Sequence, residues 1–323
     1  MHIPKWLLKS LCGFSLFIAL APALAAYPDR PVKLIIPFAP GGGTDIVGRF
    51  LAEKLGAGTG VTFVPENRPG AAAAIGANLV AKAPPDGYTL LLGTSAELTM
   101  VPNISASTPY DPLTDFTPIA LIGSTPNILL AKETAPFNDI VELIAQAKAN
   151  PGTLFYASGG MGPYLSGELF KYMANVTVTN VSYAGTGPAT SDLLGGHVDM
   201  MVSTVPAAEP LVKTHRVKAL AVTSTKRSAQ LPDVPTMDEM GLKGYEATTW
   251  FGLFAPANVP QEVSQKLKAE IEKILNAKEV QEKMAKMGIE LSTAENRYTL
   301  DTRMKDDLEK WKRLITQANI EAR

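Results

Sequence analysis

Short apolar runs alternate with longer amphipathic segments along most of the chain. Three runs in the first third, at 32–38, 61–65 and 88–93, end at or near Gly or Pro and predict buried strands. The segments that begin near Thr44 and Ala71 have the spacing of helices and lie between these strands. Strands that alternate with helices are typical of an α/β protein, so the pattern predicts mainly parallel sheets.

A second series of the same kind follows a connection rich in Pro, Ser and Thr at 101–118. Two strands are predicted on either side of Ser124, Thr125 and Pro126, at 119–123 and 127–131. A helix over 138–150 follows, with Asn138 as its expected N-cap. The remaining elements are strands at 153–157, 176–182, 198–204, 217–223 and 248–256, and helices at 261–276, 279–288 and 296–322.

Two α/β series joined by extended runs predict two lobes, with two strands crossing between them. The chain is expected to leave lobe 1 near residue 124 and to return near residue 250, so lobe 1 comprises 27–124 with 251–323, and lobe 2 comprises 125–250. The last helix should dock through an apolar face spaced by three and four residues: Leu300, Met304, Leu308, Trp311, Ile315 and Ala318. A cleft between the lobes is the expected ligand site.

The first 26 residues have the three parts of a secretory signal peptide. Lys5 and Lys9 form a basic start, an apolar stretch covers 11–20, and Ala23-Leu24-Ala25 fits a cleavage site. The alternatives are a membrane anchor, for which the apolar stretch falls short of about 20 residues, and a lipoprotein at Cys12, which lies too early in that stretch. We therefore predict export with cleavage, which leaves a mature chain without cysteine and without disulfides.

Charge and motifs exclude several classes of function. The formal net charge is −1 and no basic block occurs, so nucleic acid is not an expected partner. Only His197 and His215 follow the predicted signal peptide, and neither belongs to a nucleophile–base or metal-ligand pattern. The sequence therefore predicts no catalytic residue, no metal site and no cofactor.

Glycine-rich loops are the chemically informative feature of the chain. They lie at 37–45, 66–77, 91–97, 156–163 and 182–196, each at the end of a predicted strand, and most lead into a helix. Exposed amides at a helix N-terminus attract anions without a cationic side chain. Ordinary βα turns are the alternative for any single loop. Two acidic residues have either a structural role or a role in ligand binding. Asp45 could cap its helix or contact the ligand, and Asp199 could fix a neighbouring loop or contact a donor group of the ligand.

Several long motifs occur together and in a fixed order. They include YPDRPVKLIIPFAPGGGTDIVGRFLAEKL, VAKAPPDGYTLLLGT, YASGGMG and VSYAGTGPATSDLLGGHVDMM. In this combination the chain resembles the Bug receptors, the periplasmic solute-binding proteins of tripartite tricarboxylate transporters. The resemblance implies a two-lobed type II periplasmic-binding-protein fold that captures small carboxylates and delivers them to a membrane permease or a sensor.

The resemblance also implies that the loops at 38–45 and 158–162 approach the ligand's carboxylate from opposite lobes. Together with the glycine-rich loops, it gives these candidate ligand-binding residues: Phe38, Gly42, Gly43, Thr44, Asp45, Gly70, Ala71, Ala72, Thr94, Ser95, Ala96, Ser158, Gly159, Gly162, Tyr183, Gly185, Thr186 and Asp199.

The chain departs from the family pattern at two places. It has alanine at 71–74, where relatives usually carry more glycine, and Ser95-Ala96-Glu97 where they often have small polar residues or a His. Glu97 is expected at the mouth of the cleft, and an acid there makes a citrate-like trianion less favourable. The expected ligand is a dicarboxylate, an aromatic acid or an amino acid, and the receptor is expected to be a periplasmic monomer. A secreted hydrolase or isomerase and a scaffold with a vestigial pocket are the alternatives.

Overall fold

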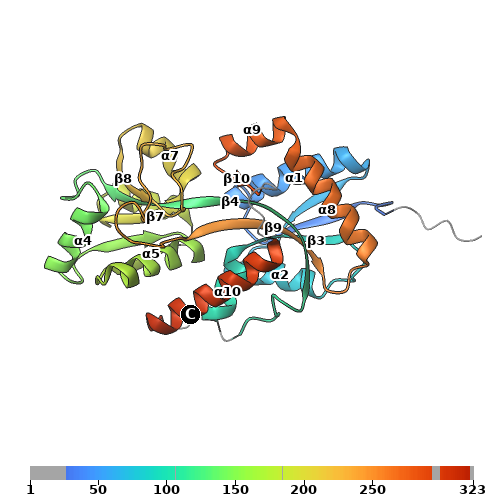
Figure 1. The fold of residues 1–323 in the computed structure, drawn as a ribbon, viewed down its shortest axis with the longest axis horizontal. Coiled ribbons are helices and arrows are strands. Elements are labelled where there is room, and N and C mark those ends of the chain that lie inside the picture. Colours follow the sequence, from blue (N-terminus) through green and yellow to red (C-terminus); the bar gives the residue numbers. More distant parts are fainter. Residues whose placement is uncertain (1–26, 106, 184, 293–298, 321–323) are drawn as a thin grey trace, which may run out of the picture.

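The computed structural model describes residues 27–105, 107–183, 185–292 and 299–320. It shows two α/β lobes joined by two long strands, β4 (Phe116–Lys132) and β9 (Thr248–Pro256) (Figure 1). The predicted signal peptide and Cys12 lie outside the described residues, as do both ends of the predicted last helix. Within the described residues, none of the helices has the length and hydropathy of a membrane span.

The sheet of lobe 1 has a parallel block at one side and the crossing strands at the other. Its order is β2, β1, β3, β9, β4, and β9 is antiparallel to both of its neighbours. Both faces are buried: Val32 and Leu34 of β1 pack toward α1 and α8, and Ile35 packs toward α2 and α10. Such two-sided burial explains the continuous apolar runs. The bounds are β1 Val32–Ile36, α1 Gly43–Thr59, β2 Phe63–Asn67, α2 Ala74–Ala81, β3 Thr89–Thr94, η2 Ala96–Met100, α3 Val101–Ile104, α8 Gln261–Asn276, α9 Lys278–Lys286, β10 Glu290–Leu291 and α10 Leu300–Gln317.

The sheet of lobe 2 is built in the same way around the other half of β4. Strands β7, β5 and β6 are parallel to one another, β7 pairs antiparallel with β4, and β8 pairs antiparallel with the opposite edge of β4. Helices α4 and α5 bury one face of this sheet, while α6 and α7 bury the other. The bounds are α4 Ile140–Ala149, β5 Phe155–Ser158, α5 Met161–Ala174, β6 Thr179–Ser182, α6 Thr186–Leu194, β7 Met200–Thr204, α7 Val205–Lys213 and β8 Val217–Val222.

The crossing strand β4 corrects one prediction. The runs at 119–123 and 127–131 are one continuous strand, not two. Pro126 does not interrupt it because β4 changes partners there: Pro126 is the last residue paired with β9, and Asn127 pairs with β7. Since β9 and β7 lie on opposite edges of β4, Pro126 stands at the end of one ladder just before the other begins, where a missing N–H is tolerated. The predicted crossing points lie opposite each other, since Ser124 pairs with Trp250.

Helix α10 contacts both lobes, although the sequence assigns it to lobe 1. Leu300 and Met304 pack with α2 and β1, whereas Trp311 and Leu314 belong to the cluster that contains α4 and α5. Figure 1 shows α10 running beneath the crossing strands toward lobe 2.

A second correction concerns helix α4. Its N-cap is Asp139 rather than the predicted Asn138, because the Asp139 carboxylate accepts the Glu142 N–H.

Candidate functional site

The loop between β1 and α1 presents uncovered main-chain amides. Its residues 39–43 are exposed, and the N-cap of α1 is Gly42, which has no side-chain capping bond. Gly41 has φ +83, a conformation that favours glycine, whereas Gly42 has φ −80. A Cβ at Gly43 would meet no atom within 4 Å. The first turn of α1 is therefore open to an approaching group.

Asp45 holds this loop from beneath. Its buried carboxylate accepts the Gly41 N–H at 2.9 Å, Asn67 Nδ2 at 2.8 Å and Arg49 Nε at 3.0 Å. Burial alone would raise the pKa of Asp45, but these hydrogen bonds and the Arg49 charge lower it to about 2. Asp45 is not the N-cap of α1, which is Gly42; it lies inside the first turn and braces the loop, and its contact with a ligand stays a prediction.

Two glycine loops of lobe 2 are in direct backbone contact. A Cβ at Gly159 would lie 2.6 Å from the carbonyl carbon of Gly185, so only glycine fits there. Helix α5 begins after Gly160 and α6 after Gly185, and neither N-cap makes a side-chain bond. Side-chain caps occur at α4 and α10, through Asp139 and Thr299, but not at α7, α8 or α9.

Residues from the loops of both lobes pack against one apolar cluster. Phe38, at the end of the β1 segment, packs against the same apolar cluster as Met161 of α5 and Ala96 of η2. The N-termini of α1, α5 and α6 each follow the carboxyl end of a parallel strand, which is where α/β folds bind ligands. Partial positive charge at such N-termini favours an anion.

Hydroxyl groups in these loops have structural partners. The Tyr183 hydroxyl donates to Asp192 at 2.6 Å, and this hydrogen bond raises the pKa of Tyr183 to about 12. Ser158 Oγ is buried and accepts Asn180 Nδ2 at 2.9 Å. Both side chains therefore help to fix the loops, while the Ser158 hydroxyl keeps its own proton to donate.

The segment after β3 is buried, which corrects the expectation for Glu97. Its side chain is 0% exposed rather than at the cleft mouth, and it accepts the Thr94 N–H and the Thr94 hydroxyl, the latter at 2.5 Å. The π-helix η2 turns Glu97 back over the end of β3, and hydrophobic periodicity gives no signal for such a turn. Burial raises the pKa of Glu97 to about 7.

Comparison with known proteins identifies the family. The family model described as "Tripartite tricarboxylate transporter family receptor" matches residues 47–320. The chain belongs to this receptor family. It is 36% identical to BugT of Bordetella pertussis over 288 residues, covering 87% of this chain and 88% of BugT.

Solved structures agree with this receptor fold. The periplasmic binding protein BugD is 37% identical, with a TM-score of 0.79 and coverage of 91% of this receptor and 99% of BugD. The R. palustris protein Rpa4515, solved with adipate, is 34% identical, with a TM-score of 0.82 and coverage of 91% and 99%. The predicted family and two-lobed fold are confirmed.

Near the cleft, the receptor's segment Gly70–Ala73 has an unusual backbone. Gly70 has φ +124, and the three alanines that follow have φ +46, +51 and +76. Helix α2 consequently begins at Ala74, not near Ala71. Alanine rarely adopts left-handed φ, at a cost of roughly 1–2 kcal/mol per residue. This segment is thus the strained loop of the candidate site.

Asp199 lies apart from the other candidates. Its carboxylate is 2.7 Å from Lys132 Nζ and accepts the Phe155 N–H at 2.9 Å. Phe155 begins β5, whereas Ser158 ends it, so Asp199 stands at the opposite end of the strand from the glycine loops. Its contacts are those of a residue that fixes the edge of the sheet.

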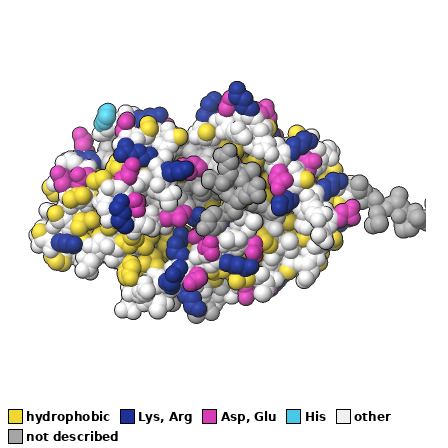
Figure 2. Space-filling model, viewed as in Figure 1, with side chains coloured by type: hydrophobic (Ala, Val, Ile, Leu, Met, Phe, Trp, Pro, Cys, Tyr) yellow, Lys and Arg dark blue, Asp and Glu magenta, His cyan; other side chains and the backbone are white. Residues whose placement is uncertain are grey.

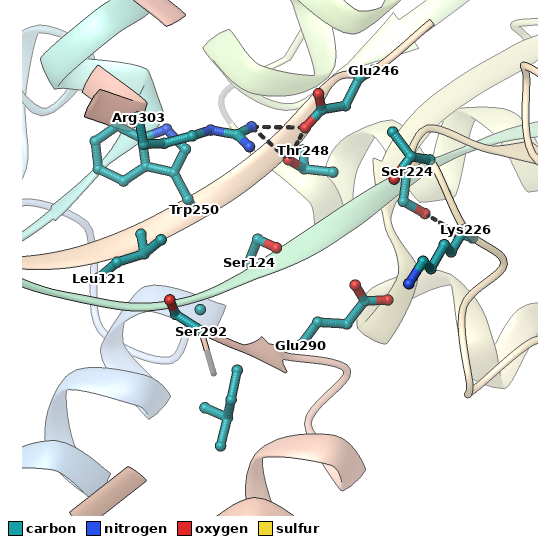
Figure 3. Close-up of a pocket in the computed structure, with 13 residues that line it drawn as sticks. Leu121, Ser124, Ser224, Lys226, Glu246, Thr248, Trp250, Glu290, Ser292 and Arg303 are labelled. Atoms are coloured by element: carbon teal, nitrogen blue, oxygen red, sulfur yellow. Dashed lines mark hydrogen bonds and ion pairs between the residues drawn. The ribbon is translucent and has the colours of Figure 1, made fainter. Parts of the chain in front are cut away.

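A cavity that no sequence pattern predicts lies on the other face of the crossing strands. This cavity of about 600 Å³ is lined by Ser124, Thr248 and Trp250, with Arg303 2.8 Å from Glu246 (Figure 3). Its lining residues come from five distant segments, so no local motif marks it. Figure 2 shows charges of both signs spread over this face. Among the described residues, no cluster of three or more His, Cys, Asp or Glu could hold a metal ion.

Proposed function

We propose that this receptor binds one small organic carboxylate between its lobes and releases it unchanged. The ligand's carboxylate accepts hydrogen bonds from main-chain amides at the N-termini of α1, α5 and α6. The supporting observation is that Gly42, Gly160 and Gly185 cap these three helices without a side-chain bond. Helices α7, α8 and α9 also lack a side-chain cap, so what distinguishes α1, α5 and α6 is a glycine at the cap position close to the end of a parallel strand.

The energetics require several amides to act together. A charge at a helix N-terminus contributes about 0.3–2 kcal/mol. Micromolar affinity corresponds to about 8 kcal/mol. Burial of the ligand body must therefore add to the amide contacts. The apolar cluster to which Phe38, Met161 and Ala96 contribute supports such burial, because it includes groups from both lobes.

The proposed ligand class is a dicarboxylate, an aromatic acid or an amino acid. The adipate in the R. palustris neighbour supports the first of these. Family membership supports a membrane permease as the receiving partner, and the periplasmic binding proteins among the structural neighbours support a periplasmic location. We further propose that residues 1–26 direct export and that the receptor is a monomer. It does not convert its ligand into a product.

The decisive test replaces Gly42 or Gly43 with valine. Neither substitution meets a steric obstacle within the protein, since the nearest atom to a Cβ at Gly42 is the Ala39 carbonyl oxygen at 3.7 Å. The branched side chain would instead stand between the amides and the anion. Ligands are first selected by thermal shift from dicarboxylates, aromatic acids and amino acids, with adipate included. Calorimetry should then show binding to wild type and none to either variant, while both unliganded variants melt within about 2 °C of wild type.

The control is Glu53→Gln, an exposed position farther along α1, which should leave affinity unchanged. Full affinity in both valine variants would overturn the backbone-amide site. Recovery of the ligand unchanged after prolonged incubation, measured by NMR, separates a receptor from the enzyme alternative.

A further inference from the structure

Three buried oxygen atoms near the crossing strands lack a hydrogen-bond partner in the described part of the chain. They are Ser95 Oγ, Thr125 Oγ1 and Asn127 Oδ1. Their residues are 0%, 4% and 1% exposed. Buried polar atoms in native proteins are nearly always paired with protein, water or ligand, because an unpaired one costs free energy. We call these three residues the floor group.

Two members of the floor group lie beneath the first turn of α5. Thr125 is paired with Thr249 across β4 and β9, and Thr249 Oγ1 lies 3.3 Å from the position of a Cβ on Gly162. Asn127 is two residues farther along β4 and therefore on the same face. Its Nδ2 donates to Ser166 Oγ at 3.0 Å, and Ser166 Oγ donates to the Gly162 carbonyl at 2.9 Å.

The third member reaches this place from lobe 1. Ser95 follows Thr94, the last residue of β3, which pairs with Phe251 of β9. The turn η2 that begins at the next residue contacts α5. The floor group thus comes from both lobes, with Thr125 and Asn127 on β4 and Ser95 before the turn that contacts α5.

The electrostatic surroundings of the floor group are unfavourable for a second carboxylate. Glu97 is buried two residues from Ser95, and Glu168 is buried on α5. Lys171 is bound to Glu168, and Arg303 pairs with Glu246 on the other face of the strands. In the described part of the chain, no lysine or arginine forms a hydrogen bond with a floor residue. Burying an anion there without a countercharge would be costly.

Hydrogen-bonding capacity points to the complementary group. The two hydroxyl groups can donate or accept, but an amide oxygen such as Asn127 Oδ1 only accepts. A ligand that satisfies all three atoms must therefore carry a donor. We propose that the floor group binds the end of the ligand opposite its carboxylate and selects an uncharged donor such as a hydroxyl group. This inference rests on the proposed function, and it narrows the ligand to a hydroxy-monocarboxylate.

Calorimetry with chain-matched acids tests the selection. The pairs are 4-hydroxybutyrate with succinate and 6-hydroxyhexanoate with adipate, so that only the distal group differs. Wild type should bind the hydroxy acid of the preferred length about tenfold more tightly than its dicarboxylate partner. Thr125→Val, which keeps the shape of the side chain and removes its hydroxyl, should weaken binding of that hydroxy acid about tenfold.

The matched control is Ser124→Ala, at the adjacent position of β4, whose side chain lines the opposite face (Figure 3). It should leave the affinity unchanged. Thr125→Val removes an unpaired hydroxyl, so its melting temperature should not fall, and a reduced affinity cannot then be ascribed to misfolding. Ser95→Ala is a second variant with the same expected direction.

The outcomes separate this inference from the proposed function. Tighter binding of the dicarboxylates, or unchanged hydroxy-acid affinity in both Thr125→Val and Ser95→Ala, overturns the floor group's role and leaves the amide site intact. Absence of binding for every acid of the wider series used to test the proposed function overturns both.

Discussion

Two loops at neighbouring strand ends of lobe 1 are each braced by a buried carboxylate, yet the two acids have opposite character. Asp45, after β1, contacts a guanidinium and has a pKa of about 2. Glu97, after β3, accepts hydrogen bonds from Thr94 but has no cation beside it, and its pKa is about 7. The difference arises from the deeper burial of Glu97 and from the Arg49 guanidinium at Asp45.

The same difference determines what each loop leaves open to a ligand. Asp45 uses one loop amide, that of Gly41, and leaves those of the first turn of α1 uncovered. Glu97 uses both the amide and the hydroxyl of Thr94, and its loop is buried. The first loop therefore offers backbone donors to an anion, while the second offers only the unpaired Ser95 hydroxyl.

Asp45→Asn should give the largest effect. The substitution removes the charge that holds Arg49 and forces an amide group against Asn67, so the free energy of unfolding at pH 7 should fall by about 2 kcal/mol. A lowered pKa stabilises the fold above the ordinary value of 3.8 and ceases to do so as the pH falls toward 2. The difference from wild type in urea unfolding should therefore shrink between pH 4 and pH 3. An equal loss of unfolding free energy in the exposed control Glu53→Gln would show that Asp45 does not stabilise this loop specifically.

Glu97→Gln should change the pH dependence of the unfolding free energy and leave the structure nearly unchanged. Between about pH 4.5 and 7 the folded protein holds a proton that the unfolded chain releases, so the wild type loses stability as the pH rises. Glutamine can still accept the Thr94 N–H and donate to its hydroxyl, without the cost of a buried charge. We expect a gain of about 1–2 kcal/mol at pH 8 and little change at pH 4.5. A difference from wild type that stays constant across this range would show that Glu97 titrates normally.

Ala72→Gly should give the smallest effect and extend the comparison to a third loop. The segment after β2 differs from the two loops above because its feature is backbone strain and not a buried acid: Ala72 has φ +51. Glycine relieves roughly 1–2 kcal/mol of left-handed strain but increases the freedom of the unfolded chain, so a net gain of about 0.5 kcal/mol is expected. Gly187→Ala, at a helical position with free space, is the control for backbone flexibility. A loss of stability in Ala72→Gly would show that the left-handed conformation of Ala72 does not destabilise the folded protein.

Local patterns predicted the regular elements well because their signals lie within a few turns. Helix α8 has the predicted bounds, Gln261–Asn276. The apolar spacing also identified Leu300, Met304 and Trp311 as buried in α10. It could not reveal that β4 continues through Pro126, because that depends on where β4 exchanges partners.

The candidate site was predicted through its backbone and less well through its side chains. Glycine before a helix is a local signal, and it located the N-termini of α1, α5 and α6. Side-chain roles depend on distant partners: Asp199 pairs with Lys132, and Asp45 with Asn67. The unpaired atoms of Thr125 and Asn127 became apparent only when β9 and α5 were placed against β4.

The position of β9 has a consequence for how the chain reaches this structure. Strands β3 and β4 follow one another in the sequence but are separated in the sheet by β9, which begins only at Thr248. Until that residue has been synthesised, both strands have an open edge facing the place that β9 will fill, and open edges pair readily with other chains. Long-range pairings of this kind also form slowly. The newly made chain therefore needs protection from aggregation until its last quarter is present, and the nascent sheet of lobe 1 is the part that needs it.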